Sequence, residues 1–294
     1  MNGARLGVSI LLIGFPALVV PAIRLARRPG AWAVVSAISI GAGFVILETA
    51  LIHAALPVLF SLVGADGLAA ACRRLGGHLF GASPAFGAVA GLLASTAGVR
   101  TVIGVNATFR AYARLREGAL HGIRSVVAGH EAVLAPMPGR FAMAIPGSSP
   151  YVLISQSLAS DLPPGELTAI VRHEMAHLHR HHQRFLILGT GVGHGLWFMP
   201  WVSRATGALR LAVERWADEE AATSPSEREH VRSALLRLGH TDSMIVRGRL
   251  TALDRPRFEA AHSTLWGWSV VATGVAPLGI AMVATLIHHI ALVT

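Results

Sequence analysis

The sequence has a single cysteine, Cys72, and its 25 basic residues are all arginine. One thiol cannot form an internal disulfide and excludes a cysteine-based zinc site, so a metal would need His, Asp or Glu ligands. Charged residues make up only 14% of the chain, against roughly 25% in an average soluble domain. This composition predicts a membrane protein with one modest polar domain.

Tyrosine is also scarce, with two residues, although the formal charge is +9. A nucleic-acid-binding surface would need clustered basic residues and aromatic platforms, and the arginines are instead scattered through the loops. Dispersed positive charge suits the anionic cytoplasmic leaflet of a bilayer. We therefore expect a lipid bilayer, and no nucleic acid, as a partner.

Long apolar runs are plentiful. Four of them reach or approach the ~20 residues that a membrane-crossing helix needs, at residues 6–23, 31–63, about 80–105 and 266–293. More arginines follow the first and third runs than lie between the second and third, where only Arg73 and Arg74 occur. The positive-inside rule then places the N-terminus outside the cell and the long segment after the third run in the cytoplasm.

These runs predict a mostly α-helical membrane protein of the bacterial inner membrane, with about four transmembrane helices and an inserted α+β domain. The expected parts are a membrane domain with three transmembrane helices at 1–108, a cytoplasmic domain at 109–264 and a C-terminal transmembrane helix at 265–294. Within the cytoplasmic domain, strands are predicted at 141–147 and 151–158, joined by a Gly/Ser/Pro turn. A helix is predicted at 162–182, with Pro163 or Pro164 in its first turn.

Residues 173–177 read HEMAH. On a helix, His173 and His177 project from one face and can bind one zinc ion, whereas Glu174 lies about 100° around the helix and can reach a metal-bound water as a general base. This is the division of roles that hydrolysis requires. The pattern arises by chance in roughly 0.03 of chains of this composition, so a third ligand is needed to strengthen the assignment.

A third ligand is offered by Glu214, four residues before Asp218 on a second predicted helix. Glu214 could complete a His₂Glu zinc site, and Asp218 could fix the tautomer of a ligating histidine. The alternative is an acidic, solvated helix face. An apolar stretch near 185–203 separates the two halves of the site. It should be buried, re-entrant or interfacial, because a crossing would put His177 and Glu214 on opposite sides of the membrane.

The paired HExxH and ExxxD motifs, set among apolar runs, resemble the membrane gluzincins. The order of parts is similar to the BlaR/MecR-type membrane metallopeptidases, most specifically over residues 141–222. The resemblance implies a gluzincin-type zinc protease domain, zinc ligands His173, His177 and Glu214, catalytic base Glu174, and a protein substrate such as a transcriptional repressor. Those antibiotic sensors continue into a penicillin-binding domain after the last span, whereas this sequence stops at Thr294. The resemblance therefore supports proteolysis and leaves open whether β-lactams are involved.

Other polar residues have two interpretations each. His179, His181 and His182 could approach the metal, but a solvated basic helix end is the simpler reading. Glu48, inside the second apolar run, is either a functional intramembrane carboxylate or the partner of an arginine. The predicted hairpin could bind substrate at its edge or serve only as core.

The sequence thus predicts a zinc endopeptidase that cleaves a protein at the cytoplasmic membrane face. Two alternatives remain at this point. One is a quality-control protease for membrane proteins, and the other is a non-enzymatic zinc-dependent sensor or scaffold.

Overall fold

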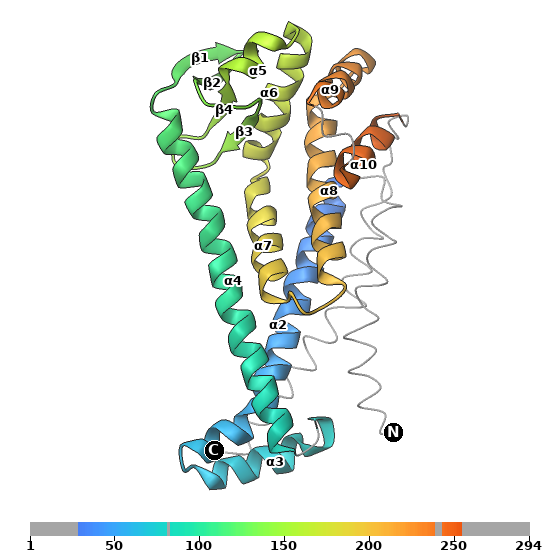
Figure 1. The fold of residues 1–294 in the computed structure, drawn as a ribbon. Coiled ribbons are helices and arrows are strands. Elements are labelled where there is room, and N and C mark those ends of the chain that lie inside the picture. The colour runs from blue at the N-terminus through green and yellow to red at the C-terminus, as the bar shows by residue number, and fades with distance from the viewer. Residues whose placement is uncertain (1–28, 81–82, 239–242, 255–294) are drawn as a thin grey trace.

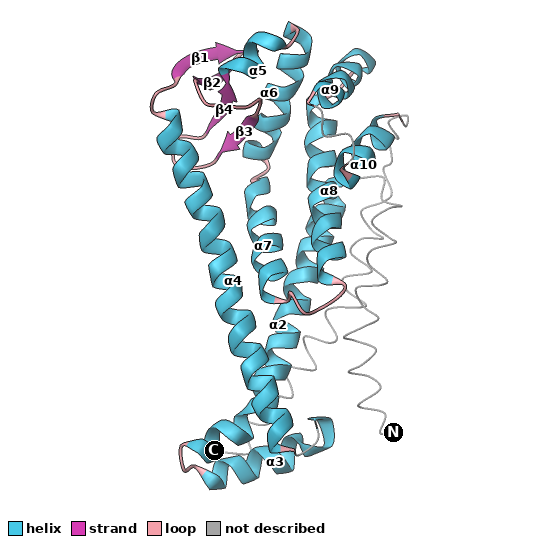
Figure 2. Cartoon of the chain, viewed as in Figure 1, coloured by secondary structure: helices cyan, strands magenta, loops and turns pink. Residues whose placement is uncertain are grey.

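A computed structural model describes residues 29–80, 83–238 and 243–254 as a bundle of long helices with a small sheet at one end (Figure 1). The predicted apolar runs at 6–23 and 266–293 lie outside the described residues. The described chain is mostly helical, as predicted (Figure 2). Its elements are α2 (Pro29–Leu62), α3 (Asp66–Phe80), α4 (Pro84–Ala119), β1 (Ile123–Val127), β2 (His130–Ala135), β3 (Ala142–Ile145), β4 (Tyr151–Ser155), α5 (Gln156–Asp161), α6 (Pro164–His179), α7 (His182–Gly195), α8 (Val202–Ala221), α9 (Pro225–Arg237) and α10 (Met244–Leu253).

Helices α2 and α4 are long and apolar enough to cross a membrane. They contain 34 and 36 residues, which at a rise of ~1.5 Å per residue exceeds the ~30 Å of a hydrocarbon core. Both helices expose large apolar side chains, among them Val45, Leu59, Val89, Leu92 and Val99. Helix α4 continues past residue 108 without a break, so it leads directly into the sheet.

The apolar stretch near 185–203 forms α7, a turn and the start of α8. In Figure 1, α7 leads away from the sheet and α8 returns beside it, both against the long helices. Buried side chains of α2, α7 and α8 share one hydrophobic core, which includes Ile40, Leu47, Val192, Leu209 and Val213. Because α7 leads away from the sheet and α8 returns, the chain brings Glu214 of α8 back to the HEMAH segment of α6.

Glycines allow α4 and α7 to approach closely. A Cβ atom on Gly104 would lie 2.8 Å from Cγ of His194, and one on Gly191 would lie 2.8 Å from Cγ2 of Val105. Small residues at a helix–helix contact are typical of packing within membranes. The contact therefore fixes α7, and through it the end of α6, against a long helix.

We expect Gly104→Ala to destabilise the protein by roughly 1–3 kcal/mol, because the added methyl group overpacks the contact with His194. Gly98→Ala is the matched control on the same helix, since its Cβ would meet no atom of the described residues within 4 Å. The control should keep or slightly raise stability, because Ala favours helix over Gly. Thermal unfolding in detergent compares the two, and equal midpoints would contradict the close approach of α4 and α7.

The sheet has the strand order β1-β2-β4-β3, in which β2 and β4 are parallel and the other neighbours antiparallel. Strands β3 and β4 form the predicted hairpin, and β3 is an edge strand. The N–H of Ser155 donates to the carbonyl of Phe141 at 3.0 Å. Because main-chain groups alternate along an antiparallel pair, those of Ala142 and Ala144 point away from β4, towards the open edge.

Helix α6 packs on this sheet through a core of Val152, Ile154, Ile170, Val171 and Leu178. It begins with Pro164 in its first position, as the sequence predicts. Glu166, in the same first turn, is buried and accepts hydrogen bonds from Ser233 and Arg237 of α9. These bonds hold the first turn of α6 against α9. The face of α6 that carries His173 and His177 lies towards α8.

Helix α9 begins with a capping box. The Ser224 hydroxyl accepts from the Glu227 N–H, and the Glu227 carboxylate accepts from the N–H of Ser224. The same carboxylate accepts from the hydroxyl and the N–H of Thr223 and pairs with Arg172 of α6. The hydrogen bonds from Thr223, followed by the one from Arg172, lower the pKa of Glu227 from 4.5 to about 2.

We expect the stabilisation from the Glu227 charge to be complete at neutral pH, because the folded pKa lies below the unfolded one. It should be lost as the pH falls from about 4.5 towards about 2. Glu227→Ala should cost roughly 1 kcal/mol at pH 7, because it removes the hydrogen bonds that the carboxylate accepts from Thr223 and from the Ser224 N–H. Unfolding midpoints of wild type and Glu227→Gln, measured between pH 7 and pH 2, should converge at the acidic end. A constant difference would show that the charge plays no part.

Candidate metal centre

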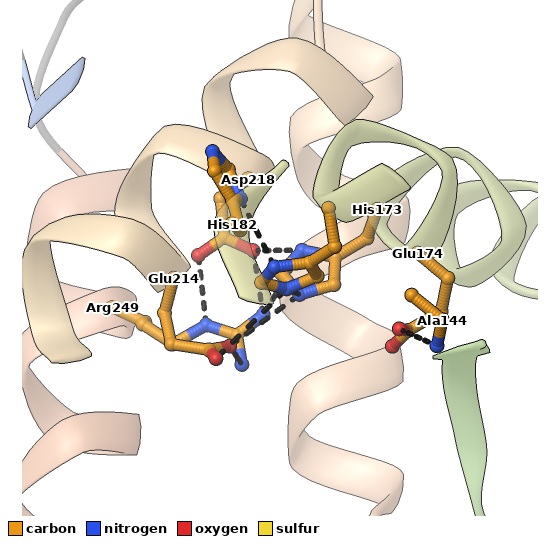
Figure 3. Close-up of polar contacts among 8 residues, drawn as sticks. Ala144, His173, Glu174, His182, Glu214, Asp218 and Arg249 are labelled. Carbon is orange, nitrogen blue, oxygen red and sulfur yellow. Dashed lines mark hydrogen bonds and ion pairs between the residues drawn. The ribbon is translucent and has the colours of Figure 1, made fainter. Parts of the chain in front are cut away.

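Helices α6 and α8 bring two histidines and a glutamate together (Figure 3). His173 and His177 face α8 from successive turns of α6, with their Nε2 atoms 3.1 Å apart. Glu214 of α8 places its Oε2 3.4 Å from Nε2 of His173 and its Oε1 3.9 Å from Nε2 of His177. Both histidines are buried. The structure thus brings together the three residues that the sequence predicts as zinc ligands.

The spacing of these atoms fits a metal ion. Zinc lies about 2.0–2.2 Å from His nitrogen and carboxylate oxygen, so neighbouring ligand atoms of a tetrahedral zinc lie about 3.3 Å apart. The two nitrogens lie 3.1 Å apart, close to this value. Glu214 offers Oε2 at 3.4 Å from His173 or Oε1 at 3.9 Å from His177, and one ligand atom from each of the three residues lies within 4.8 Å of the others. The group could therefore hold a metal ion through two nitrogens and one oxygen.

Asp218 lies one turn after Glu214 on α8 and is 2% exposed. Its Oδ1 is 3.0 Å from Nδ1 of His173, which leaves Nε2 of that ring for the metal. Burial and the Arg249 charge oppose protonation of His173, but hydrogen bonds to Asp218 and Glu214 outweigh them and raise its pKa to about 9. A metal at Nε2 would replace this second proton, as metal binding to histidine generally does.

Glu174 stands apart from the three ligands, on the side of β3 (Figure 3). Its Oε2 accepts a hydrogen bond of 2.8 Å from the N–H of Ala144, one of the two residues at the open edge. Burial raises the pKa of Glu174 to about 7, against the opposing charge of His173. A carboxylate with a pKa near the working pH is suited to take up and release a proton.

Two residues of the centre were not predicted, and one of them corrects the sequence interpretation. His179 and His181 are exposed, as expected of a helix end, but His182 is fully buried. Its Nδ1 lies 3.0 Å from Nδ1 of His177. Burial lowers the pKa of His182 to about 4. The left-handed conformation of His181, with φ of 52°, turns the chain so that the next ring points inwards.

Arg249 of α10 is the second residue that sequence reasoning missed. Its Nε and Nη2 atoms lie 2.8 and 2.6 Å from the two Asp218 oxygens, and its Nη1 lies 3.0 Å from Oε2 of Glu214. Burial would raise the pKa of Asp218, but the Arg249 charge outweighs it and holds the pKa below its usual value. No local pattern distinguishes this residue from the many other arginines of the chain.

A cavity of about 320 Å³ opens beside the centre. His173, His177, Glu174 and Glu214 line it together with the β3 residues Ala142, Met143 and Ala144. Apolar side chains of α6, α9 and the residue that follows α9 form another part of its wall, namely Ile170, Val231, Ala234, Leu235 and Leu238. The buried His173–His177–Glu214 group, the Glu174 carboxylate and the edge strand β3 therefore face one space.

The arrangement can bind a cation, place a base beside it and accept a chain along β3. Comparison with protein-family models, curated proteins and solved structures finds no match to this chain. The resemblance to membrane metallopeptidases therefore remains a prediction from the two motifs and the order of the apolar runs.

Proposed function

We propose that the protein is an integral-membrane zinc endopeptidase. The observation that carries the proposal is the convergence of His173, His177 and Glu214 on one point, with Glu174 facing the same cavity. A His₂Glu set is a ligand set of catalytic zinc sites, which keep a position open for water or substrate. When bound, zinc lowers the pKa of water and polarises a substrate carbonyl.

The residues of the chain have distinct roles in this proposal. Glu174 takes a proton from the attacking water and delivers it to the leaving amine, for which its pKa of about 7 is suited. Asp218 accepts the Nδ1 proton of His173 and so holds the ring in the tautomer that binds metal through Nε2. Arg249 compensates the charges of Asp218 and Glu214.

The substrate in this proposal is a protein segment in extended conformation. Among the described residues, β3 pairs with β4 alone, so the main-chain groups of Ala142 and the carbonyl of Ala144 can pair with an added strand, the mode in which extended peptides bind to sheet edges. The apolar wall formed by Ile170, Val231 and Leu235 favours an apolar side chain next to the cleaved bond. By the motif resemblance, a transcriptional repressor is one such substrate.

Comparison of protein N-termini in cells that produce wild type or Glu174→Gln tests this function. We expect new N-termini that require Glu174, flanked by apolar residues at the cleavage point. Glu229→Gln is the control, since this α9 side chain is 67% exposed. If wild type and Glu174→Gln yield the same set of N-termini, the protease function is wrong.

We place the sheet and the metal centre on the cytoplasmic side, which the arginine distribution supports. Helix α3 lies at the opposite end of the long helices (Figure 1) and would then face the outside. In a Cys72→Ser background, a membrane-impermeant maleimide added to intact cells should label Arg74→Cys on α3 but not Val126→Cys on β1. Both positions are exposed. Labelling of Val126→Cys in intact cells would show that the sheet faces the outside, opposite to the proposed orientation.

A further inference from the structure

His182 is the one fully buried histidine among the described residues, at 0% exposure. It is the first residue of α7, five positions after His177, and lies beyond the end of α6, the helix that carries His173 and His177. His181 between the two helices has a left-handed φ of 52°, and the His182 ring after it lies against the His177 ring, with centroids 4.9 Å apart. Its place needs an explanation, because a buried imidazole is costly unless it is hydrogen-bonded.

The contact between the two rings joins Nδ1 to Nδ1 at 3.0 Å. One of these nitrogens must carry the hydrogen and the other must accept it. Nε2 of His177 faces His173 and Glu214, and it can bind a metal only as a bare lone pair. A neutral His177 with a bare Nε2 carries its hydrogen on Nδ1, so Nδ1 of His182 is then the acceptor.

The His182 ring is held in place by its surroundings. It packs against Trp216 with ring centroids 4.7 Å apart. The indole N–H of Trp216 donates to Glu220 at 3.1 Å, and the Arg180 guanidinium lies 5.6 Å from the indole centroid. Within the described residues, Nε2 of His182 has no hydrogen-bond partner, so the bond to His177 is the ring's one polar contact there.

We infer that His182 is a positioning residue, which accepts the Nδ1 hydrogen of His177 and so fixes the tautomer and orientation of this zinc ligand. Asp218 makes the corresponding contact with His173 at the same distance of 3.0 Å. The two ligand histidines are therefore oriented by different chemistry, one by a carboxylate and the other by a neutral imidazole. Outer partners of this kind typically change metal affinity 10- to 100-fold when they are removed.

The inference rests on the proposed zinc site but not on proteolysis, so its test measures metal affinity. We expect His182→Phe in the full chain, purified in detergent, to raise the Kd for Zn²⁺ by about 10- to 100-fold in a chelator competition. His182→Asn should bind close to wild type, because its side-chain oxygen can take the position of Nδ1 as an acceptor. A role in packing alone predicts the opposite order, since Phe fills the space better than Asn.

Trp216→Phe is a second control, because it loosens the packing of His182 and leaves the acceptor intact. It should lower the unfolding midpoint of the metal-free protein with little effect on the Kd for Zn²⁺. If His182→Phe fails to fold, His182→Leu takes its place as the variant without an acceptor. Equal Kd values for wild type and the acceptor-free variant would overturn the inference, as would equal weakening by Asn and Phe. If the Kd values follow the expected order but the zinc-bound wild type cleaves no peptide, that result would instead count against the proposed protease alone.

Discussion

Glu174→Gln is expected to abolish peptide cleavage while the protein keeps its full zinc content. Glutamine has the size of glutamate and can still accept the hydrogen bond from the Ala144 N–H, but it cannot take a proton from water. A general base contributes about 10²- to 10⁴-fold to a rate, so kcat should fall by at least this range. Metal binding should persist, because Glu174 lies outside the group of ligand atoms formed by His173, His177 and Glu214.

Glu214→Gln provides the complementary result. It removes a charged ligand, so zinc content and cleavage should be lost together. Zinc per chain and the hydrolysis of a peptide with apolar residues, both measured on purified protein, separate the two variants. Zinc loss in Glu174→Gln, or full zinc in Glu214→Gln, would reassign the ligands. Cleavage by Glu174→Gln at the wild-type rate would exclude this residue as the base.

The residues that could be predicted are those whose relation is local. His173 and His177 lie four positions apart, and any helix there places them on one face. The same holds for Glu214 and Asp218 on α8. The convergence of the two pairs could be proposed only because their chemistry is complementary. It depends physically on the path of α7 and α8, out along the long helices and back.

His182 and Arg249 could not be predicted, because their positions depend on tertiary structure. A helical projection places His182 away from the ligand row, and only the left-handed turn at His181 brings it back. Arg249 reaches Asp218 across 31 positions, from a different helix. Strands β1 and β2 were not predicted either, although they form a local hairpin with positive φ at Ala128 and Gly129. The parallel pairing of β2 with β4 is the long-range contact that no local pattern shows. Sequence periodicity reports which face of an element is buried, and not which element covers it.

Arg249→Met should have opposite effects on the metal-free and the zinc-bound protein. Without metal, the substitution removes the guanidinium that faces the carboxylates of Asp218 and Glu214, whose side chains are 3% and 18% exposed. Removing one partner of a buried ion pair typically costs about 3–5 kcal/mol. The unfolding midpoint of the metal-free protein should therefore fall.

Binding of Zn²⁺ should restore part of the stability that Arg249→Met loses. Arg249 shares Glu214 with the metal site, so its positive charge both competes for the carboxylate and repels a cation. Removing it should increase the rise in unfolding midpoint that Zn²⁺ produces, because a ligand stabilises the state to which it binds more tightly. Arg247→Met, two positions earlier on α10, is the matched control, since this side chain is exposed.

Unfolding scans of wild type, Arg249→Met and Arg247→Met, with chelator and with excess Zn²⁺, measure both effects together. We expect Arg247→Met to behave as wild type in both conditions. A metal-free Arg249→Met as stable as wild type would mean that the two carboxylates are already neutralised by protons or by His173. A smaller zinc-induced rise than in wild type would mean that Arg249 supports the metal site by orienting Glu214, rather than competing for it.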